Sequence, residues 1–282
     1  MSEVKIANMV VGAGYPTMII AEVGINHNGD FETARELVRQ AHKAGASAVK
    51  LQTYTTERRV PKDSPIFGIL KKCELSYDQQ AQLIDLGREL GVEVFSTPFD
   101  EQAVEFLNKT GVACHKVASF DIVNLKLLRA IAQSRKPVIM SRGMATAAEV
   151  EKALEIFKRY GVPVILLHCV SAYPVSNHKD LNLATIRALE SQYGCPVGFS
   201  DHTIGPEAAV AAVYAGACAI EKHFTLSCTQ EGPDHAMSAD PEGLARLVLG
   251  IRRAEEMMGK PVRGPIKTEE PILQYRRPSD AP

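Results

Sequence analysis

Two histidines lie at the ends of successive short apolar runs. His202 follows PVGFSD (196–201) and His223 closes ACAIEKH (217–223), with the helix-like GPEAAVAAVYAG (205–216) between them. If the two runs are neighbouring parallel strands, both imidazoles face the same edge of the sheet. Two imidazoles bind a divalent transition metal and leave positions open for water or substrate oxygens, which suits a Lewis acid that polarises a carbonyl. The alternative is a pair of core histidines that only make hydrogen bonds.

Two lysines interrupt otherwise apolar runs. Lys50 lies in SAVKLQ (47–52), and Lys116 lies in ACHKVAS (113–119). A lysine in such a run is costly unless it is paired or used. Either one of them is a Schiff-base nucleophile, or both bind phosphate and carboxylate as fixed cations, or each only extends to the end of its strand. Hydroxyl groups at nearby run ends favour the anion pocket; they are Thr97, Ser119, Ser141 and Ser200.

Two glutamates belong to the first and the last of these runs. Glu22 lies in TMIIAEVG (17–24), and Glu221 comes two residues before the second histidine. Each suits a general base or a group that holds a metal-bound water. The alternative is a salt bridge to Lys50 or Lys222. No Walker A, G-x-G-x-x-G or C-x-x-C motif offers a different chemistry.

The elements that carry these residues alternate regularly between strand-like and helix-like segments. The strand candidates are short and apolar on both faces, as covered parallel strands are; they are residues 17–24, 47–52, 92–98, 113–119, 137–143, 163–169, 196–201 and 217–223. The amphipathic segments have typical helix caps; they are residues 31–45, 76–91, 100–111, 124–134, 146–161, 181–194, 205–216 and 241–259. Eight of each predict an α/β fold, a (β/α)8 TIM barrel. A doubly wound open sheet is the alternative, because alternation alone does not show closure.

Three further segments complete the predicted organisation. Residues 1–16 are expected to form a hairpin that plugs the barrel bottom, and residues 54–75 a long loop. We predict a barrel domain at residues 1–264 and a linker or extension, rich in Pro and charge, at residues 265–282. In a barrel the active site lies at the carboxyl ends of the strands. The polar run ends expected at this one rim are Glu22, Lys50, Gln52, Ser96, Thr97, Lys116, Ser119, Ser141, Arg142, His168, Ser171, Ser200, Asp201, His202, Glu221 and His223.

The composition excludes several classes of partner. The 282 residues include 32 basic and 33 acidic side chains, so a general attraction to nucleic acid or to membranes is not expected. No apolar run approaches the ~20 residues that span a bilayer, and the N-terminus lacks the pattern of a signal peptide. Six scattered cysteines predict reduced thiols and a cytoplasmic protein.

Eight ordered stretches resemble the N-acetylneuraminate (sialic acid) synthase family over roughly residues 3–265. This set of motifs is highly specific. They are AEVGINHNGD (21–30), AVKLQTY (48–54), FSTPFD (95–100), HKVASFDI (115–122), CVSAYP (169–174), FSDHT (199–203), EKHFT (221–225) and GPDHAMS (232–238).

The resemblance implies a metal-dependent condensation of phosphoenolpyruvate with an aldose similar to N-acetylmannosamine. The products would be a nonulosonic or related 2-keto sugar acid and phosphate, released by C–O cleavage. It implies a divalent ion, Mn2+ before Mg2+ or Co2+, on His202 and His223, and catalytic roles for Glu22 and Glu221. Tyr173 is expected to contact the acceptor, as is Asp234. The implied phosphoenolpyruvate contacts are Lys50, Thr97, Lys116, Ser119, Ser141, Ser171 and Ser200.

The chain departs from the family pattern at three places. It has SRGM (141–144) where the family often has Ser-Thr-Gly-Met, so Arg142 adds a charge beside a predicted pocket serine. It has Ser171 where sialic acid synthases often have Asn. The family's C-terminal antifreeze-like domain, which covers the partner subunit's site in a homodimer, is expected to be missing. The chain would then be either a shortened sequence or a naturally single-domain member.

Three other functions compete with this one. An octulosonate-phosphate or other aldulosonate synthase would use Arg58, Arg59 or Arg142 as an additional anion site. A Schiff-base aldolase would use Lys50 or Lys116 as its nucleophile. A non-catalytic barrel would bind a sugar phosphate or a protein partner without turnover.

Overall fold

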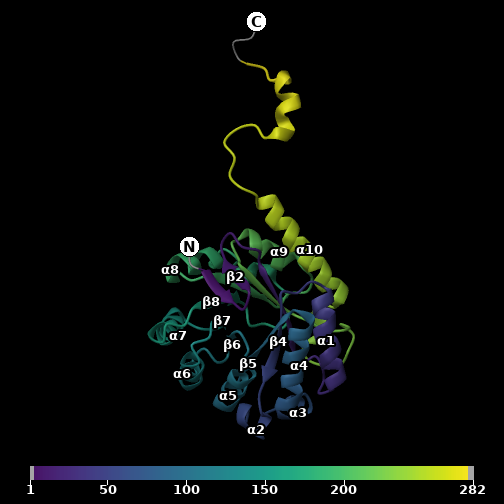
Figure 1. Cartoon of the computed structure of the whole chain (residues 1–282), viewed down its shortest axis with the longest axis vertical. Helices are drawn as coiled ribbons and strands as arrows, with labels where there is room; N and C mark the ends of the chain where they lie inside the picture. The colour runs from purple at the N-terminus through teal and green to yellow at the C-terminus, as the bar shows by residue number, and fades with distance from the viewer. Residues whose placement is uncertain (1–2, 279–282) are drawn as a thin grey trace.

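The computed structural model describes residues 3–278, and the predictions for residues 1–2 and 279–282 lie outside it. Eight parallel strands close into a barrel in the order β10-β3-β4-β5-β6-β7-β8-β9 (Figure 1). Closure confirms the TIM barrel and excludes the open sheet. The strands are β3 (Met18–Gly24), β4 (Ala48–Thr53), β5 (Glu93–Pro98), β6 (His115–Val117), β7 (Val138–Ser141), β8 (Val164–Cys169), β9 (Val197–Asp201) and β10 (Ala219–His223).

Helices surround the barrel, one following each strand (Figure 1). Their ends obey the sequence signals: Ser76 and Gln79 form a capping box, and Gly91 and Gly111 end their helices in the left-handed region. The helices of the outer ring are α1 (Phe31–Lys43), α4 (Tyr77–Leu90), α5 (Glu101–Thr110), α6 (Leu125–Gln133), α7 (Ala147–Arg159), α8 (Thr185–Tyr193), α9 (Glu207–Tyr214) and α10 (Pro241–Met258).

Strand register decides which polar residues become neighbours. Glu22 on β3 lies beside Lys50 on β4 and beside His223 on β10. Ser200 on β9 lies beside Glu221 on β10. Successive residues of a strand point to opposite faces, so every second residue faces the barrel interior. The first and last barrel strands therefore bring their carboxylates and histidine to one place.

Some predicted boundaries differ from the structure. The strand predicted at 113–119 is only His115–Val117, so Ser119 lies on the turn that follows it. The helix predicted at 181–194 begins at Thr185. A 3-10 turn (His178–Leu181) precedes it, and Asn182, with φ 44°, ends this turn before α8 begins. Asparagine tolerates this left-handed conformation, which ends a helical segment.

The hairpin predicted near the N-terminus is present as β1 (Glu3–Ile6) and β2 (Met9–Gly12). Its buried side chains Val4, Ile6 and Val11 pack into the main core. The long segment after β4 forms two short helices, α2 (Thr56–Arg59) and α3 (Phe67–Lys72).

The tail beyond α10 runs away from the barrel (Figure 1) and contains the exposed 3-10 helix Lys267–Tyr275. Within residues 3–278 no helix combines the length and the hydrophobicity needed to cross a membrane.

Candidate active site

A cavity of about 280 Å³ opens at the carboxyl ends of the barrel strands. It collects side chains from nearly every strand, which is where barrel enzymes carry their active sites. All but one of the predicted site residues line it; they are Glu22, Lys50, Thr97, Lys116, Ser119, Ser141, Tyr173, Ser200, His202, Glu221, His223 and Asp234. The structure thus brings together residues that are up to 212 positions apart in the chain.

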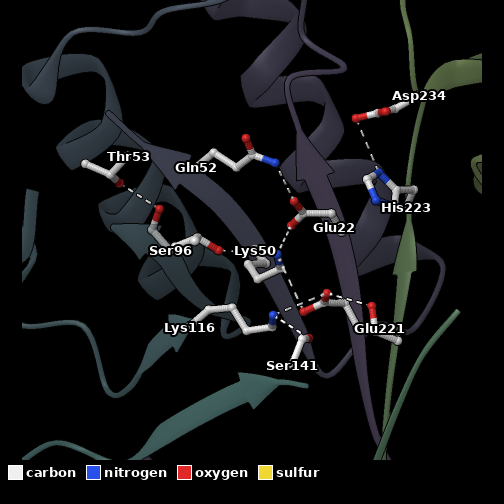
Figure 2. A network of polar contacts seen from close by, with 12 residues as sticks. Glu22, Lys50, Gln52, Thr53, Ser96, Lys116, Ser141, Glu221, His223 and Asp234 are labelled. Carbon is white, nitrogen blue, oxygen red and sulfur yellow. Dashed lines mark hydrogen bonds and ion pairs between the residues drawn. The ribbon is translucent and has the colours of Figure 1, made fainter. Parts of the chain in front are cut away.

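Two lysines and two glutamates form a buried charged network at the base of this cavity (Figure 2). Lys50 Nζ lies 2.8 Å from Glu22 Oε2 and 3.5 Å from Glu221 Oε2. Lys116 Nζ lies 3.8 Å from Glu221 Oε1. Glu221 nevertheless retains a buried oxygen, Oε2, that accepts no hydrogen bond. Buried polar atoms rarely lack a partner, so the network has capacity for a ligand.

Hydroxyl groups surround the two ammonium groups. Lys116 Nζ donates to Ser141 Oγ at 2.7 Å, and Lys50 Nζ donates to Thr97 Oγ1 at 3.4 Å. Ser200 Oγ donates to Glu221 Oε1 at 3.1 Å. Fixed cations flanked by hydroxyl donors suit an oxyanion such as phosphate or carboxylate.

The pKa values of the two glutamates are shifted in opposite directions. Burial raises the pKa of Glu22, and the nearby Glu221 raises it further, while Lys50 opposes the rise. Burial also acts to raise the pKa of Glu221, but Lys116 and Lys50 outweigh it, so the net pKa of Glu221 is lowered. Two carboxyl groups with separated pKa values can divide proton transfer and charge stabilisation between them.

The two lysines also differ. Burial lowers the pKa of Lys116, and Glu221 offsets this only in part. Burial acts the same way on Lys50, but its two glutamate partners raise its pKa overall. Lys50 is therefore held firmly as a cation.

Both predicted metal-binding histidines face the cavity, with ring centroids 5.6 Å apart. His202 Nδ1 donates to the Val170 carbonyl at 2.8 Å, so Nε2 carries the lone pair of the ring; it lies 3.5 Å from Ser200 Oγ. Burial lowers the pKa of both imidazoles, so both are neutral and able to ligate. His223 Nδ1 is buried without a hydrogen bond, 3.6 Å from Asp234 Oδ2.

These donors fit a metal site built on two imidazoles. Across residues 3–278 no group of three or more His, Cys, Asp or Glu side chains is arranged to hold a metal ion. The remaining positions of a divalent ion here would belong to substrate oxygens and water, as in open catalytic sites. The nature and presence of the ion stay predictions.

Tyr173 and Asp234 lie on the histidine side of the cavity. The Tyr173 ring centroid is 4.3 Å from that of His202 and 6.2 Å from that of His223. Burial raises the pKa of the Asp234 carboxyl and of the Tyr173 hydroxyl. Both predicted acceptor residues are therefore next to the predicted metal ligands.

Ser171 is the predicted site residue that does not line this cavity. Its hydroxyl lies 3.1 Å from Ser119 Oγ and faces a separate depression instead. Gly143 packs against both serines: a Cβ there would lie 2.3 Å from Ser119 Cβ and 2.7 Å from Ser171 Oγ. Glycine at this position lets the turn approach the serines closely. Direct contact between Ser171 and phosphoenolpyruvate stays a prediction.

The rim prediction is wrong for four other residues. Ser96 and Asp201 each adjoin a cavity-facing residue on their strand, so alternation turns them outward, whereas Arg142 follows the end of β7 and lines a separate depression. Ser96 Oγ bonds Thr53 Oγ1 at 2.6 Å, and Asp201 Oδ2 accepts from Lys222 Nζ at 2.8 Å. His168 Nε2 donates to the Leu181 carbonyl, and it shares the separate depression with Arg142.

Several lining residues lie outside the predicted site set, although Arg59 was one of three arginines considered as an additional anion site. Gln52 Nε2 donates to Glu22 Oε1 at 3.0 Å, and Arg59 Nη1 donates to Gln52 Oε1 at 3.0 Å. Gln52 was recognisable as a strand end, whereas Arg59 lies in the segment predicted as a loop. The large apolar side chains of the lining also received no role, although four of them lie within the family motifs, namely Ile25, Phe99, Phe120 and Pro233; the others are Ile66, Ile69 and Leu70.

Fold and site together define a TIM barrel with a charged, hydroxyl-rich cavity at the strand carboxyl ends. A family model described as "NeuB family" matches residues 37–263. The chain therefore belongs to the NeuB family.

Similar proteins agree with this assignment. The N,N'-diacetyllegionaminic acid synthase of Legionella pneumophila is 40% identical over 95% of this chain and 80% of its own length. The pseudaminic acid synthase of Helicobacter pylori is 36% identical over 87% of this chain and 76% of its own. The crystal structure of the N-acetylneuraminic acid (sialic acid) synthetase of Leptospira borgpetersenii, in complex with citrate, superimposes with a TM-score of 0.92 at 39% identity, covering 98% of this chain and 96% of that one.

Proposed function

We propose that this protein condenses phosphoenolpyruvate with an aldose to give a sialic-acid-like 2-keto sugar acid and phosphate. The observation that carries the proposal is the buried network of Lys50, Lys116, Glu22 and Glu221, flanked by hydroxyls at the barrel mouth. Relatives named as synthases of legionaminic, pseudaminic and sialic acids support it.

Phosphoenolpyruvate binds at the base of the cavity in this proposal. Its phosphate and carboxylate carry the charge that Lys50 and Lys116 attract, and Thr97, Ser141 and Ser200 donate hydrogen bonds beside them. A buried, preorganised set of donors stabilises such charges more strongly than water does. The aldose then occupies the side of the cavity near Tyr173.

The reaction forms one C–C bond and breaks one C–O bond. Carbon 3 of phosphoenolpyruvate attacks the aldehyde carbon of the acceptor, and the aldehyde oxygen takes up a proton. Water adds to carbon 2, and phosphate leaves by C–O cleavage, so carbon 2 becomes the keto carbon. The two protons of this water balance the proton taken up by the aldehyde oxygen and the one that leaves with phosphate. A divalent ion held by His202 and His223 would supply Lewis-acid polarisation of a carbonyl.

The opposite pKa shifts support different roles for the two glutamates. In this proposal Glu22, whose pKa is raised, is the better proton donor of the two and protonates the new hydroxyl. Glu221, whose pKa is lowered, remains ionised and balances the positive charge that develops at carbon 2. The sequence left this choice open, and the opposite pKa shifts support this division.

Phosphate release from phosphoenolpyruvate tests the proposal. The acceptor panel contains N-acetylmannosamine, its 6-phosphate, diamino-hexose analogues and simple aldoses, with and without Mn2+, and the product masses are read in parallel. Release that requires both an aldose and a divalent ion is expected, with lower metal content and activity in His202→Ala and His223→Ala. Full activity in metal-free buffer would contradict metal dependence. The absence of both phosphate release and phosphoenolpyruvate binding would contradict the proposal.

A Schiff-base mechanism predicts a different product. Borohydride added with pyruvate would link the ligand to Lys116, whose lowered pKa is the feature that favours such chemistry. We expect no adduct by mass spectrometry, because Lys116 Nζ is engaged by Ser141 Oγ and the Val117 carbonyl.

A further inference from the structure

The loop between β10 and α10, residues 224–240, brings Asp234 to the cavity. Asp234 Oδ2 lies 3.6 Å from His223 Nδ1 (Figure 2). Residues 229–233, which lead to Asp234, are all exposed and belong to no helix or strand. Such a segment opens more easily than the barrel beneath it, so the position of Asp234 depends on the side chains that hold this loop from behind.

Asn28, in the turn after β3, holds the outer part of this loop. Its Nδ2 donates to the Glu231 carbonyl at 3.1 Å and lies 3.3 Å from His235 Nε2. Thr225 Oγ1 donates its hydrogen to the Ser227 carbonyl, so it accepts from His235 Nδ1, which is 2.7 Å away. His235 Nε2 therefore carries the lone pair that accepts the second amide hydrogen of Asn28.

The two partners of Asn28 flank Asp234 in the sequence. Glu231 comes three residues before Asp234, and His235, which is buried, follows it directly. The chain between them passes close to both anchoring side chains, because a Cβ on Gly232 would lie 2.7 Å from His235 Cδ2 and 3.3 Å from Asn28 Oδ1. Asn28 thus fixes the path of the backbone that carries Asp234.

A second asparagine of the same turn holds the inner part of the loop. Asn26 Nδ2 donates to the Phe224 carbonyl and to Ser238 Oγ, both at 2.9 Å. Ser238 Oγ in turn donates to the Asp234 carbonyl at 2.6 Å. Asn26 is buried in the protein, whereas Asn28 is only partly buried, so Asn28 can be changed with less effect on folding.

These anchoring side chains do not line the cavity, and the amide hydrogens of both asparagines are already used by the loop. They come from two motifs, AEVGINHNGD (21–30) and GPDHAMS (232–238). The pairing of β3 with β10 brings the two motifs together. One motif therefore supplies the cavity residue Asp234, and the other supplies its support.

We propose that Asn28 is a positioning residue that holds Asp234 beside His223, on the predicted acceptor side of the site. Asn28 touches no substrate and acts only through the loop of residues 224–240. A displacement of about 1 Å at a reacting site can cost about 10²-fold in rate, so an anchor outside the cavity affects turnover. The inference rests on the proposed function, because the position of Asp234 has its consequence in that reaction.

The test compares Asn28→Gly with Asn182→Gly in the full-length chain. The two asparagines are matched: their φ angles are 52° and 44°, and each donates from Nδ2 to a backbone carbonyl. Glycine keeps this backbone conformation, so each variant removes only the side chain. With the aldose of the panel that the wild type uses best, Asn28→Gly is expected to lower acceptor kcat/KM roughly 10- to 100-fold. The KM for phosphoenolpyruvate should stay within about 3-fold, as should every constant of Asn182→Gly.

A double-mutant cycle with Asp234→Asn separates positioning from a general structural effect. If Asn28 acts only through Asp234, Asn28→Gly lowers acceptor kcat/KM by less than about 3-fold when Asp234→Asn is already present. Urea unfolding checks that every variant folds. An equal loss with and without Asp234→Asn would overturn the inference, and so would wild-type kinetics in Asn28→Gly.

Amide hydrogen exchange, read by mass spectrometry, follows the loop without any turnover. In a peptide covering residues 226–236, Asn28→Gly is expected to raise the exchange rate roughly 10-fold, the value of the lost hydrogen bonds, and Asn182→Gly is expected to leave it unchanged. Unchanged exchange in Asn28→Gly would overturn the inference whatever the kinetics. A wild type that turns over no aldose would count against the proposed function, and the exchange result would still decide whether Asn28 holds the loop.

Discussion

The two faces of β9 and β10 carry similar ionisable residues in different settings. On the outer face Lys222 Nζ donates to Asp201 Oδ2 at 2.8 Å and to the Thr203 carbonyl. Asp201 Oδ1 also accepts from Thr203 N and Oγ1, both at 2.8 Å. This ion pair is buried, and its polar atoms have hydrogen-bond partners within the protein.

The inner face, one residue away along each strand, is incomplete. Glu221 and His223 each retain a buried atom without a hydrogen bond, and Lys50 is shared between two carboxylates. Both faces hold buried charge, so burial alone does not separate a structural pair from a reactive one. The unfilled hydrogen-bonding capacity on the inner face makes the difference, because it faces a cavity that a ligand can enter.

Glu221→Gln should separate the inner face from the outer one most clearly. Loss of the ionised carboxylate beside both lysines is expected to lower kcat by about 10²- to 10⁴-fold. Steady-state phosphate release measures the loss, and urea unfolding measures stability. A kcat within 10-fold of wild type would remove Glu221 from the mechanism.

Lys222→Met should lower stability and leave kcat nearly unchanged. It leaves Asp201 buried without its ion pair, which is expected to cost about 3–5 kcal/mol of unfolding free energy. Urea unfolding measures the loss, and kcat per folded molecule should stay within a few-fold of wild type. If kcat falls 100-fold in the folded protein, the outer pair is part of the site and the contrast fails.

Glu22 gives the smallest expected effect, in the pH dependence of stability. Its folded-state pKa is raised above the ordinary 4.5, so the folded protein keeps a proton that the unfolded chain releases. Stability from this group is full below about pH 4.5 and is lost as the pH rises through the folded-state pKa, with a slope of up to about 1.4 kcal/mol per pH unit. Urea unfolding across this range should show the slope in wild type and not in Glu22→Gln.

The same titration bears on activity. If Glu22 acts as the acid, kcat of the wild type declines as the pH rises through its pKa. If kcat declines over the same pH range in Glu22→Gln, another group causes the decline.

Most of the barrel and its rim were predictable because strand periodicity and strand ends are local signals. The run ends Glu22, Lys50, Lys116 and Glu221 all reach the cavity. The error at Asp201 came from treating every polar residue of a run end as inward, although alternation excludes two successive residues from the same face. Strand parity would have assigned Ser200 and His202 inward and Asp201 outward.

The lining from residues 54–75 was harder to predict. Arg59, Ile66 and Ile69 come from a segment without strand or long-helix periodicity, so their place depends on how that segment folds over the barrel. Its packing around Tyr54 and Leu70 is tertiary. The place of Ser171 beside Ser119, outside the cavity lining, was hard to predict for a related reason, since it depends on the close approach at Gly143.

The pairing of β3 with β10 places Glu22 beside His223, so the site straddles the seam where the barrel ring closes. A chain emerging from the ribosome therefore has no complete site until its last barrel strand has docked. Catalytic competence would appear late in synthesis and all at once. Moving the chain ends to another loop should preserve activity, whereas separating β3 from β10 should abolish it.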